Sequence, residues 1–210
     1  MPNWTENWLT ISGPEDQVKT LCAFVEKKEG EEHTVFSFDS IIPMPRLLSQ
    51  VEEGSRLQDA LEAWFGDWER QAAGLSRHGV VGLDSREALK KHLVKKDPGL
   101  ERLALLGRFC ERQYGHRSWY PWCWEHWGTK WDACYPERED RCEEEVAYRF
   151  QTAWSAPLPV IERLSTMFPD LEIELCFRDE DPGDEEIELV FRNGKLVKES
   201  REVFEMEEEE

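Results

Sequence analysis

The fold of this chain is decided by the segment Leu171-Glu172-Ile173-Glu174-Leu175-Cys176-Phe177. Apolar and polar side chains alternate along it, and this period of two is typical of a strand with one buried face. A second alternating segment covers residues 187–191, and Asn193-Gly194 behind it is a signal for a tight hairpin turn. The C-terminal part of the chain is therefore predicted to form antiparallel strands.

The residues before this strand predict a β-α-β unit. Residues 145–152 alternate in the same way. Pro157 suits the first turn of a helix, and an apolar stripe at helical spacing follows it over residues 160–168. Residues 145–198 are accordingly predicted as β-α-β-β-β.

The start of the chain carries a second β-α-β pattern. Residues 3–12 alternate as a strand does, and Pro14 then begins an amphipathic helix that extends to about Lys28. The run 34–42 is β-branched and aromatic and is followed by prolines, which predicts the second strand there.

Residues 44–115 change from strand to helix periodicity. Apolar side chains repeat at helical spacing over residues 57–68, and Asp84 and Asp97-Pro98 are helix-start signals. The link over residues 72–83 contains three glycines and is expected to be mobile. This part of the chain is predicted to be a helical insertion.

Together these patterns predict an α+β fold: a ferredoxin-like, split β-α-β antiparallel sheet with two helices on one face, a helical insertion and an extra C-terminal β-hairpin. The ferredoxin-like domain is assigned to residues 1–43 and 116–199, the insertion to 44–115 and an acidic tail to 200–210. Twelve residues are predicted to form the core: Leu9, Ile11, Leu21, Val25, Phe36, Phe38, Tyr148, Phe150, Ile161, Leu164, Ile173 and Leu175.

The chain is strongly acidic. Its 210 residues include 26 Lys and Arg against 45 Asp and Glu, a net charge of −19 at neutral pH. Such a surface repels phosphate backbones, so no direct contact with nucleic acid is expected, and a basic protein is the expected partner. The acids predicted to make this contact lie in two segments: Asp179, Glu180, Asp181, Asp184, Glu185, Glu186 and Glu188, helped by Glu143, Glu144 and Glu145.

Six cysteines are present, and three of them lie in periodic apolar segments where a thiol packs as a small hydrophobic group. No disulfide is predicted, because these cysteines lie in apolar segments. No metal or other cofactor is predicted, because the ligand spacing for zinc is poor. The first ligands to test for zinc would be Cys123, His126, Cys134 and Cys142. The chain also lacks an apolar run of membrane-spanning length and a signal peptide, so a soluble, cytoplasmic protein is expected.

An aromatic segment holds five of the ten tryptophans within residues 119–131. Three interpretations remain open. The rings pack over the sheet, they form a patch that binds a protein, or they stack on sugars or bases. The residues of this platform are Trp119, Trp122, Trp124, Trp127, Lys130 and Trp131.

An enzymatic alternative uses the N-terminus. Removal of Met1 would expose Pro2 as a secondary amine, and apolar neighbours would lower its pKa toward neutrality so that it acts as a base, as in proline-based tautomerases. Catalysis is otherwise not indicated, since the sequence carries no nucleotide-binding loop and no serine-hydrolase signature.

Several motifs together resemble the YubB ferredoxin-like family of phage and plasmid proteins. They are spread in matching order over residues 1–178: Met1-Pro2-Asn3-Trp4, Phe36-Ser37-Phe38, Ile41-Ile42-Pro43-Met44-Pro45, Trp119-Tyr120, Trp127 to Ala133, and Thr152-Ala153-Trp154-Ser155. The resemblance implies a ferredoxin-like domain carried by mobile genetic elements and brings no established activity or catalytic residue. It also implies a role in the bacterial host, such as binding a basic defence protein by imitating nucleic acid.

Overall fold

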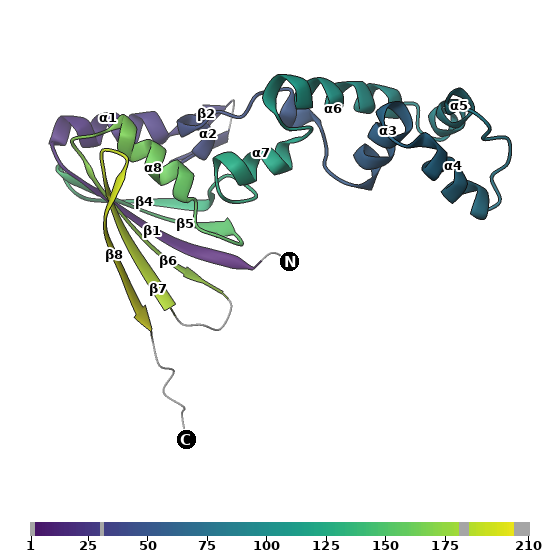
Figure 1. Cartoon of the computed structure of the whole chain (residues 1–210). Helices are drawn as coiled ribbons and strands as arrows, with labels where there is room; N and C mark the ends of the chain where they lie inside the picture. The colour runs from purple at the N-terminus through teal and green to yellow at the C-terminus, as the bar shows by residue number, and fades with distance from the viewer. Residues whose placement is uncertain (1–2, 30–31, 181–184, 204–210) are drawn as a thin grey trace. The chain divides into compact units, whose positions relative to one another are not determined.

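The structure, a computed structural model, describes residues 3–29, 32–180 and 185–203. The chain divides into two compact units. One unit comprises Met1–Pro43 and Cys123–Glu210 and contains a six-stranded sheet, whereas the other comprises Met44–Trp122 and is helical (Figure 1). Within the described ranges, no helix is both long and apolar enough to cross a membrane.

Six antiparallel strands form the main sheet, in the spatial order β4-β5-β1-β6-β7-β8. Their bounds are β1 (Trp4–Ser12), β4 (Cys134–Cys142), β5 (Glu145–Ala153), β6 (Glu172–Asp179), β7 (Glu185–Arg192) and β8 (Lys195–Val203). Strand β1 is central, paired with β5 on one side and β6 on the other.

The connections are those of a split β-α-β fold. Helix α1 (Glu15–Val25) follows β1, and helix α8 (Leu158–Met167) connects β5 to β6. Both helices lie over the same face of the sheet (Figure 1). In sequence order, strands β1, β4, β5 and β6 are the four strands of the ferredoxin-like arrangement, and β7 and β8 add the predicted C-terminal hairpin. The predicted fold class is confirmed.

The prediction of a strand at residues 34–42 was wrong. This part of the chain forms a two-stranded hairpin, β2 (Lys27–Glu29) with β3 (Glu32–Thr34), followed by the short helix α2 (Phe38–Ile41). The second strand of the fold is instead β4, which comes after the helical unit in sequence. Strand β4 is an edge strand and exposes almost every side chain, so its charged sequence shows no apolar period.

The core lies between the sheet and its helices. All twelve residues predicted for it are buried, including Phe36 and Phe38, although these two do not belong to a strand. The Phe36 ring lies 5.0 Å from that of Tyr148 and 5.2 Å from that of Phe150, measured between centroids. Phe36 reaches the core from a loop and Phe38 from a helix. The burial of these aromatic side chains therefore does not depend on the type of backbone that carries them.

The hairpin turn between β7 and β8 is confirmed. Asn193 and Gly194 have φ angles of 49° and 69°, and two consecutive left-handed residues are what a type I′ turn requires. The predicted β-α-β-β-β order of residues 145–198 is thus present in full.

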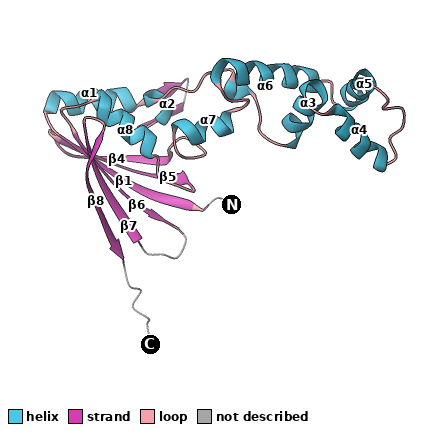
Figure 2. Cartoon of the chain, viewed as in Figure 1, coloured by secondary structure: helices cyan, strands magenta, loops and turns pink. Residues whose placement is uncertain are grey.

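The second unit consists of helices (Figure 2). They are the 3-10 helix η1 (Leu48–Gln50), α3 (Ser55–Phe65), α4 (Trp68–Arg77), α5 (Arg86–Lys96) and α6 (Leu100–Tyr114), and the boundary with the first unit falls within α7 (Trp119–His126). The expected link at 72–83 is shorter than predicted, because α4 extends to Arg77. The Ser85 hydroxyl, rather than Asp84, caps α5 by accepting from the amide of Ala88.

Candidate functional site

One face of the sheet carries α1 and α8, and among the described residues of this unit no helix lies over the other face (Figure 1). Side chains alternate between the faces, so the even-numbered residues of β1 point to this open face while its odd-numbered residues are buried. The register extends the rule across the sheet, since Trp8 stands opposite Arg149 on β5 and opposite Cys176 on β6.

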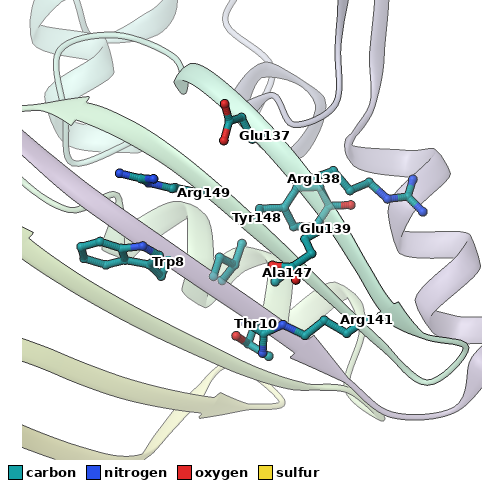
Figure 3. A pocket seen from close by; sticks show the side chains of 10 residues that line it. Trp8, Thr10, Glu137, Arg138, Glu139, Arg141, Ala147, Tyr148 and Arg149 are labelled. Carbon is teal, nitrogen blue, oxygen red and sulfur yellow. The ribbon is translucent and has the colours of Figure 1, made fainter.

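A hollow of about 340 Å³ lies on the β4-β5-β1 part of the open face (Figure 3). We call it the Trp8 depression, and its lining includes Trp8, Thr10, Glu139, Arg141, Ala147 and Arg149. Thr10 and Ala147 face each other on β1 and β5, next to the larger pair Trp8 and Arg149. The hollow exists because two small side chains sit beside two large ones.

Arg149 stands between this depression and a second hollow of about 260 Å³, which it also lines. Its side chain is 60% exposed, and its guanidinium lies 3.7 Å from a carboxylate oxygen of Glu6. That distance is too long for a hydrogen bond. Arg141 at the other end of the depression donates to Glu145 at 3.1 Å.

The predicted acidic residues do not form one surface. Glu145 pairs with Ser12 at one end of β1, whereas Asp179 pairs with Thr5 near the other end. Seven residues of strand separate these positions by about 23 Å. Glu143 and Glu144 form the β4–β5 turn, so they share the end of Glu145.

The pleat also divides the acids of residues 179–188. Glu186 and Glu188 are on the open face, opposite Arg178 and Cys176, whereas Glu185 is on the other face and forms an ion pair with Arg201. The Asp179 carboxylate accepts from the Thr5 hydroxyl, and the Glu180 carboxylate accepts from the amide of Trp4. Asp181 and Asp184 lie outside the described residues, as does Pro2.

Sequence reasoning missed three acids that the register adds to the open face. We define the acid patch as Glu172 and Glu174 on β6, Glu186 and Glu188 on β7, and Glu202 on β8. Glu186 and Glu202 stand directly opposite each other. Basic side chains are interleaved, since Arg192 pairs with Glu172 and Lys198 with Glu188.

The acid patch surrounds the thiol of Cys176. Burial, a hydrogen bond with Glu186 and the charges of Glu188 and Glu174 raise the pKa of Cys176 to about 12. Hydrogen bonds from Lys198 and Ser200 hold the pKa of Glu188 below its usual range, so this carboxylate stays charged. The thiol therefore stays protonated in a negative field.

The aromatic segment is partly core. Trp122 and Trp127 are 4% exposed, and the indole N–H of Trp127 donates to the carbonyl of Ile42 at 3.0 Å. These two rings are therefore buried and are not exposed for stacking on a ligand. Trp119, Trp124 and Trp131 are half-buried.

Side chains of this segment belong to a cluster of four tryptophans and one lysine. Two members of the cluster, Trp4 and Trp154, lie outside the predicted platform. Trp124 stacks on Trp154, Trp131 packs on Trp4, and the Lys130 ammonium lies 4.9 Å from the Trp154 ring centroid and 4.4 Å from that of Trp131. Trp154 has a φ of 75°, which is uncommon for a bulky residue.

Hydrogen bonds hold the turn that carries Trp154. The Thr152 hydroxyl donates to the Ser155 carbonyl at 2.8 Å, the Ser155 hydroxyl to the Gly128 carbonyl at 2.6 Å, and the Thr129 hydroxyl to the Ala153 carbonyl at 2.9 Å. Trp124 covers one face of Trp154, and Lys130 lies against Trp154 and Trp131, so the geometry of the cluster favours a structural role over a free stacking platform.

The residues named for a zinc test are not brought together. Cys134 begins β4 and Cys142 ends it, and their partners on β5, Gln151 and Glu145, are six residues apart, which is about 20 Å. Cys123 is buried, and burial together with the charges of Asp132 and Asp39 raises the pKa of its thiol to about 12. A thiol held protonated in this way is a poor metal ligand.

The comparison with family models agrees with this fold. A family model described as a ferredoxin-like domain in Api92-like protein matches residues 128–210. A crystal structure of the protein api92 from Yersinia pseudotuberculosis is similar over 98% of this chain and 99% of that chain, with 13% sequence identity and a TM-score of 0.49. No curated protein sequence matches. Residues 128–210, which hold β4 to β8 and α8, are thus similar to the ferredoxin-like domain of Api92-like proteins.

Proposed function

We propose that this protein has no catalytic turnover and binds a basic host protein through the acid patch on the open face of its sheet. The observation that carries the proposal is the register of β6, β7 and β8. It holds five carboxylates on one face of three paired strands. A folded scaffold of this kind keeps charges at constant spacing, which a solvated tail does not do.

The spacing within the patch resembles that of a phosphate backbone. Adjacent strands lie about 4.8 Å apart, and side chains on one face repeat every two residues, about 6.6 Å along a strand. The chain's net charge of −19 adds long-range attraction for a basic partner and speeds association. Imitation of nucleic acid is consistent with both properties.

The resemblance to phage and plasmid proteins supplies the biological setting of the proposal. A protein of a mobile genetic element gains from disabling nucleic-acid-handling defence proteins of its bacterial host, and these expose basic clefts. Since fold alone does not imply function, the proposal depends on the acid patch and not on the ferredoxin-like fold.

The test is capture of partners from a bacterial lysate by the immobilised full-length protein. We expect basic proteins to be retained at about 0.1 M salt and released at about 1 M, where the Debye length falls to about 3 Å. Duplex DNA should compete with them, because it offers the same charge to the same cleft.

Two matched double variants test which acids bind the partner. Glu174→Gln with Glu186→Gln removes two charges from the acid patch, and Glu143→Gln with Glu144→Gln removes two from the β4–β5 turn, outside the patch. The first variant should lose capture and the second should keep it. Equal capture by both variants, or capture that resists about 1 M salt, would contradict the proposal.

A further inference from the structure

The Trp8 depression is on the half of the open face that the acid patch does not use. We propose that it binds a nucleoside monophosphate, a ligand that combines one planar ring system with one phosphate. This inference is independent of the proposed function, because the two sites share no residue.

The shape of the depression suits a small planar ligand. Its volume of about 340 Å³ is at the small end of the range for small-molecule sites. The small side chains of Ala147 and Thr10 line the floor of the depression, and the Trp8 indole lies beside them on β1 (Figure 3). A ring placed over Ala147 would contact the indole, and base–aromatic stacking is a common source of affinity.

The anion would be held by Arg149. Among the described residues this guanidinium forms no hydrogen bond, and its ion pair with Glu6 is 3.7 Å long. A guanidinium has five N–H donors in a planar fork that matches two phosphate oxygens. Arg149 is thus 60% exposed and lines the depression.

The other polar groups suit the donors and acceptors of a base. Glu139 lines the depression from the edge strand and provides acceptors for an exocyclic amine, and the Thr10 hydroxyl both donates and accepts. Arg178 lies 6.0 Å from the Trp8 ring centroid and adds a positive charge beside the indole. A ligand that carries both N–H donors and an anion fits this mixed lining better than a simple anion does.

The charge of the protein limits the ligand to a single nucleotide. Every further phosphate would extend beyond the arginines over a surface that is acidic as a whole, with a net charge of −19. An oligonucleotide should therefore bind more weakly per site than the monophosphate.

The experiment is an NMR titration of the ¹⁵N-labelled full-length protein with AMP, adenosine, inorganic phosphate and a short oligonucleotide. AMP should shift the amides of Thr10 and Ala147 saturably and bind more tightly than the other three probes. Arg149→Gln should weaken the binding of AMP at least tenfold, because charge-assisted hydrogen bonds to the phosphate are lost. Ala147→Leu should abolish binding by filling the hollow.

Arg192→Gln is the matched control, because Arg192 is 64% exposed on the same face but does not line the depression. It should leave AMP affinity unchanged. Absence of saturable shifts with AMP, equal weakening by Arg149→Gln and Arg192→Gln, or tighter binding of phosphate or of the oligonucleotide would each overturn the proposal. If Ala147→Leu fails to fold, the comparison of AMP binding by Arg149→Gln and Arg192→Gln still tests the proposal.

Discussion

Asp132 connects a sequence motif to the helix that it caps. Its carboxylate accepts from the Ser37 hydroxyl at 2.7 Å and from the amides of Phe38 at 2.6 Å and Ala133 at 2.7 Å. The Phe38 amide belongs to the first turn of α2, where it has no partner within the helix. Within the motif of residues 127–133, Asp132 thus has a structural role.

Burial raises the pKa of Asp132, and the hydrogen bonds that it accepts only partly oppose this effect. Because the folded protein holds this proton more tightly than the unfolded chain, the free energy of unfolding contributed by Asp132 rises as the pH falls through its folded pKa. The gain levels off below the unfolded pKa of about 3.9.

The prediction is tested by comparing the native protein with Asp132→Asn, which does not titrate. The difference in free energy of unfolding between the two, measured by urea denaturation from about pH 7 to about pH 4, should move in favour of the native protein as the pH falls. A difference that moves the other way would mean that hydrogen bonds to the carboxylate outweigh its burial.

At the scale of elements, the β7–β8 hairpin depends on a glycine for two separate reasons. Gly194 has a φ of 69°, and a Cβ added there would come within 2.2 Å of the Thr166 hydroxyl oxygen on α8. Its amide also donates to the Ser165 hydroxyl at 3.0 Å, which connects the turn to the helix. The turn therefore fixes the hairpin against the helical layer.

Gly194→Ala should lower the free energy of unfolding by more than the approximately 1–2 kcal/mol that a left-handed alanine costs. Adding Thr166→Ala should recover the steric part and leave the backbone part, so that the double variant loses about 1–2 kcal/mol. Urea denaturation of both single variants and the double variant measures this coupling. If the losses in free energy of unfolding of the two single variants add up in the double variant, the contact between an alanine at position 194 and Thr166 has no energetic cost.

At the scale of the whole molecule, charge is divided unevenly between the two units. Residues 44–122 contain 13 Lys and Arg and 11 Asp and Glu, a net charge of +2, so the remaining residues carry −21. This net charge already includes the bases that form ion pairs, such as Arg192 with Glu172 on the sheet. The sheet-bearing unit therefore repels itself, and this repulsion opposes the compact state.

Moderate salt should stabilise the protein for this reason. Raising the ionic strength from about 0.01 M to about 0.15 M shortens the Debye length from about 30 Å to about 8 Å, and the melting temperature should rise at neutral pH. The rise should vanish near the isoelectric point of about 4.7. Calorimetry at the two pH values checks both statements, and a melting temperature insensitive to salt at neutral pH would contradict them.

Elements with one buried face could be predicted from the sequence alone. The alternation of residues 171–177, the stripe of α8 and the Asn193-Gly194 turn are local signals, because one buried face imposes its period on the chain. The same logic found the core, including Phe36 and Phe38, since aromatic side chains are buried whatever backbone carries them.

The pairing of the strands, and the sites that depend on this pairing, could be established only from the folded structure. Strand β4 is held by backbone hydrogen bonds to β5, so its charged side chains give no periodic signal. Register with distant strands places Trp8 beside Arg149 and sends Glu145 and Asp179 to opposite ends of β1. The hydrophobic period of a strand indicates which of its sides is buried. The register of β1, in contrast, depends on partner strands more than a hundred residues away in the sequence.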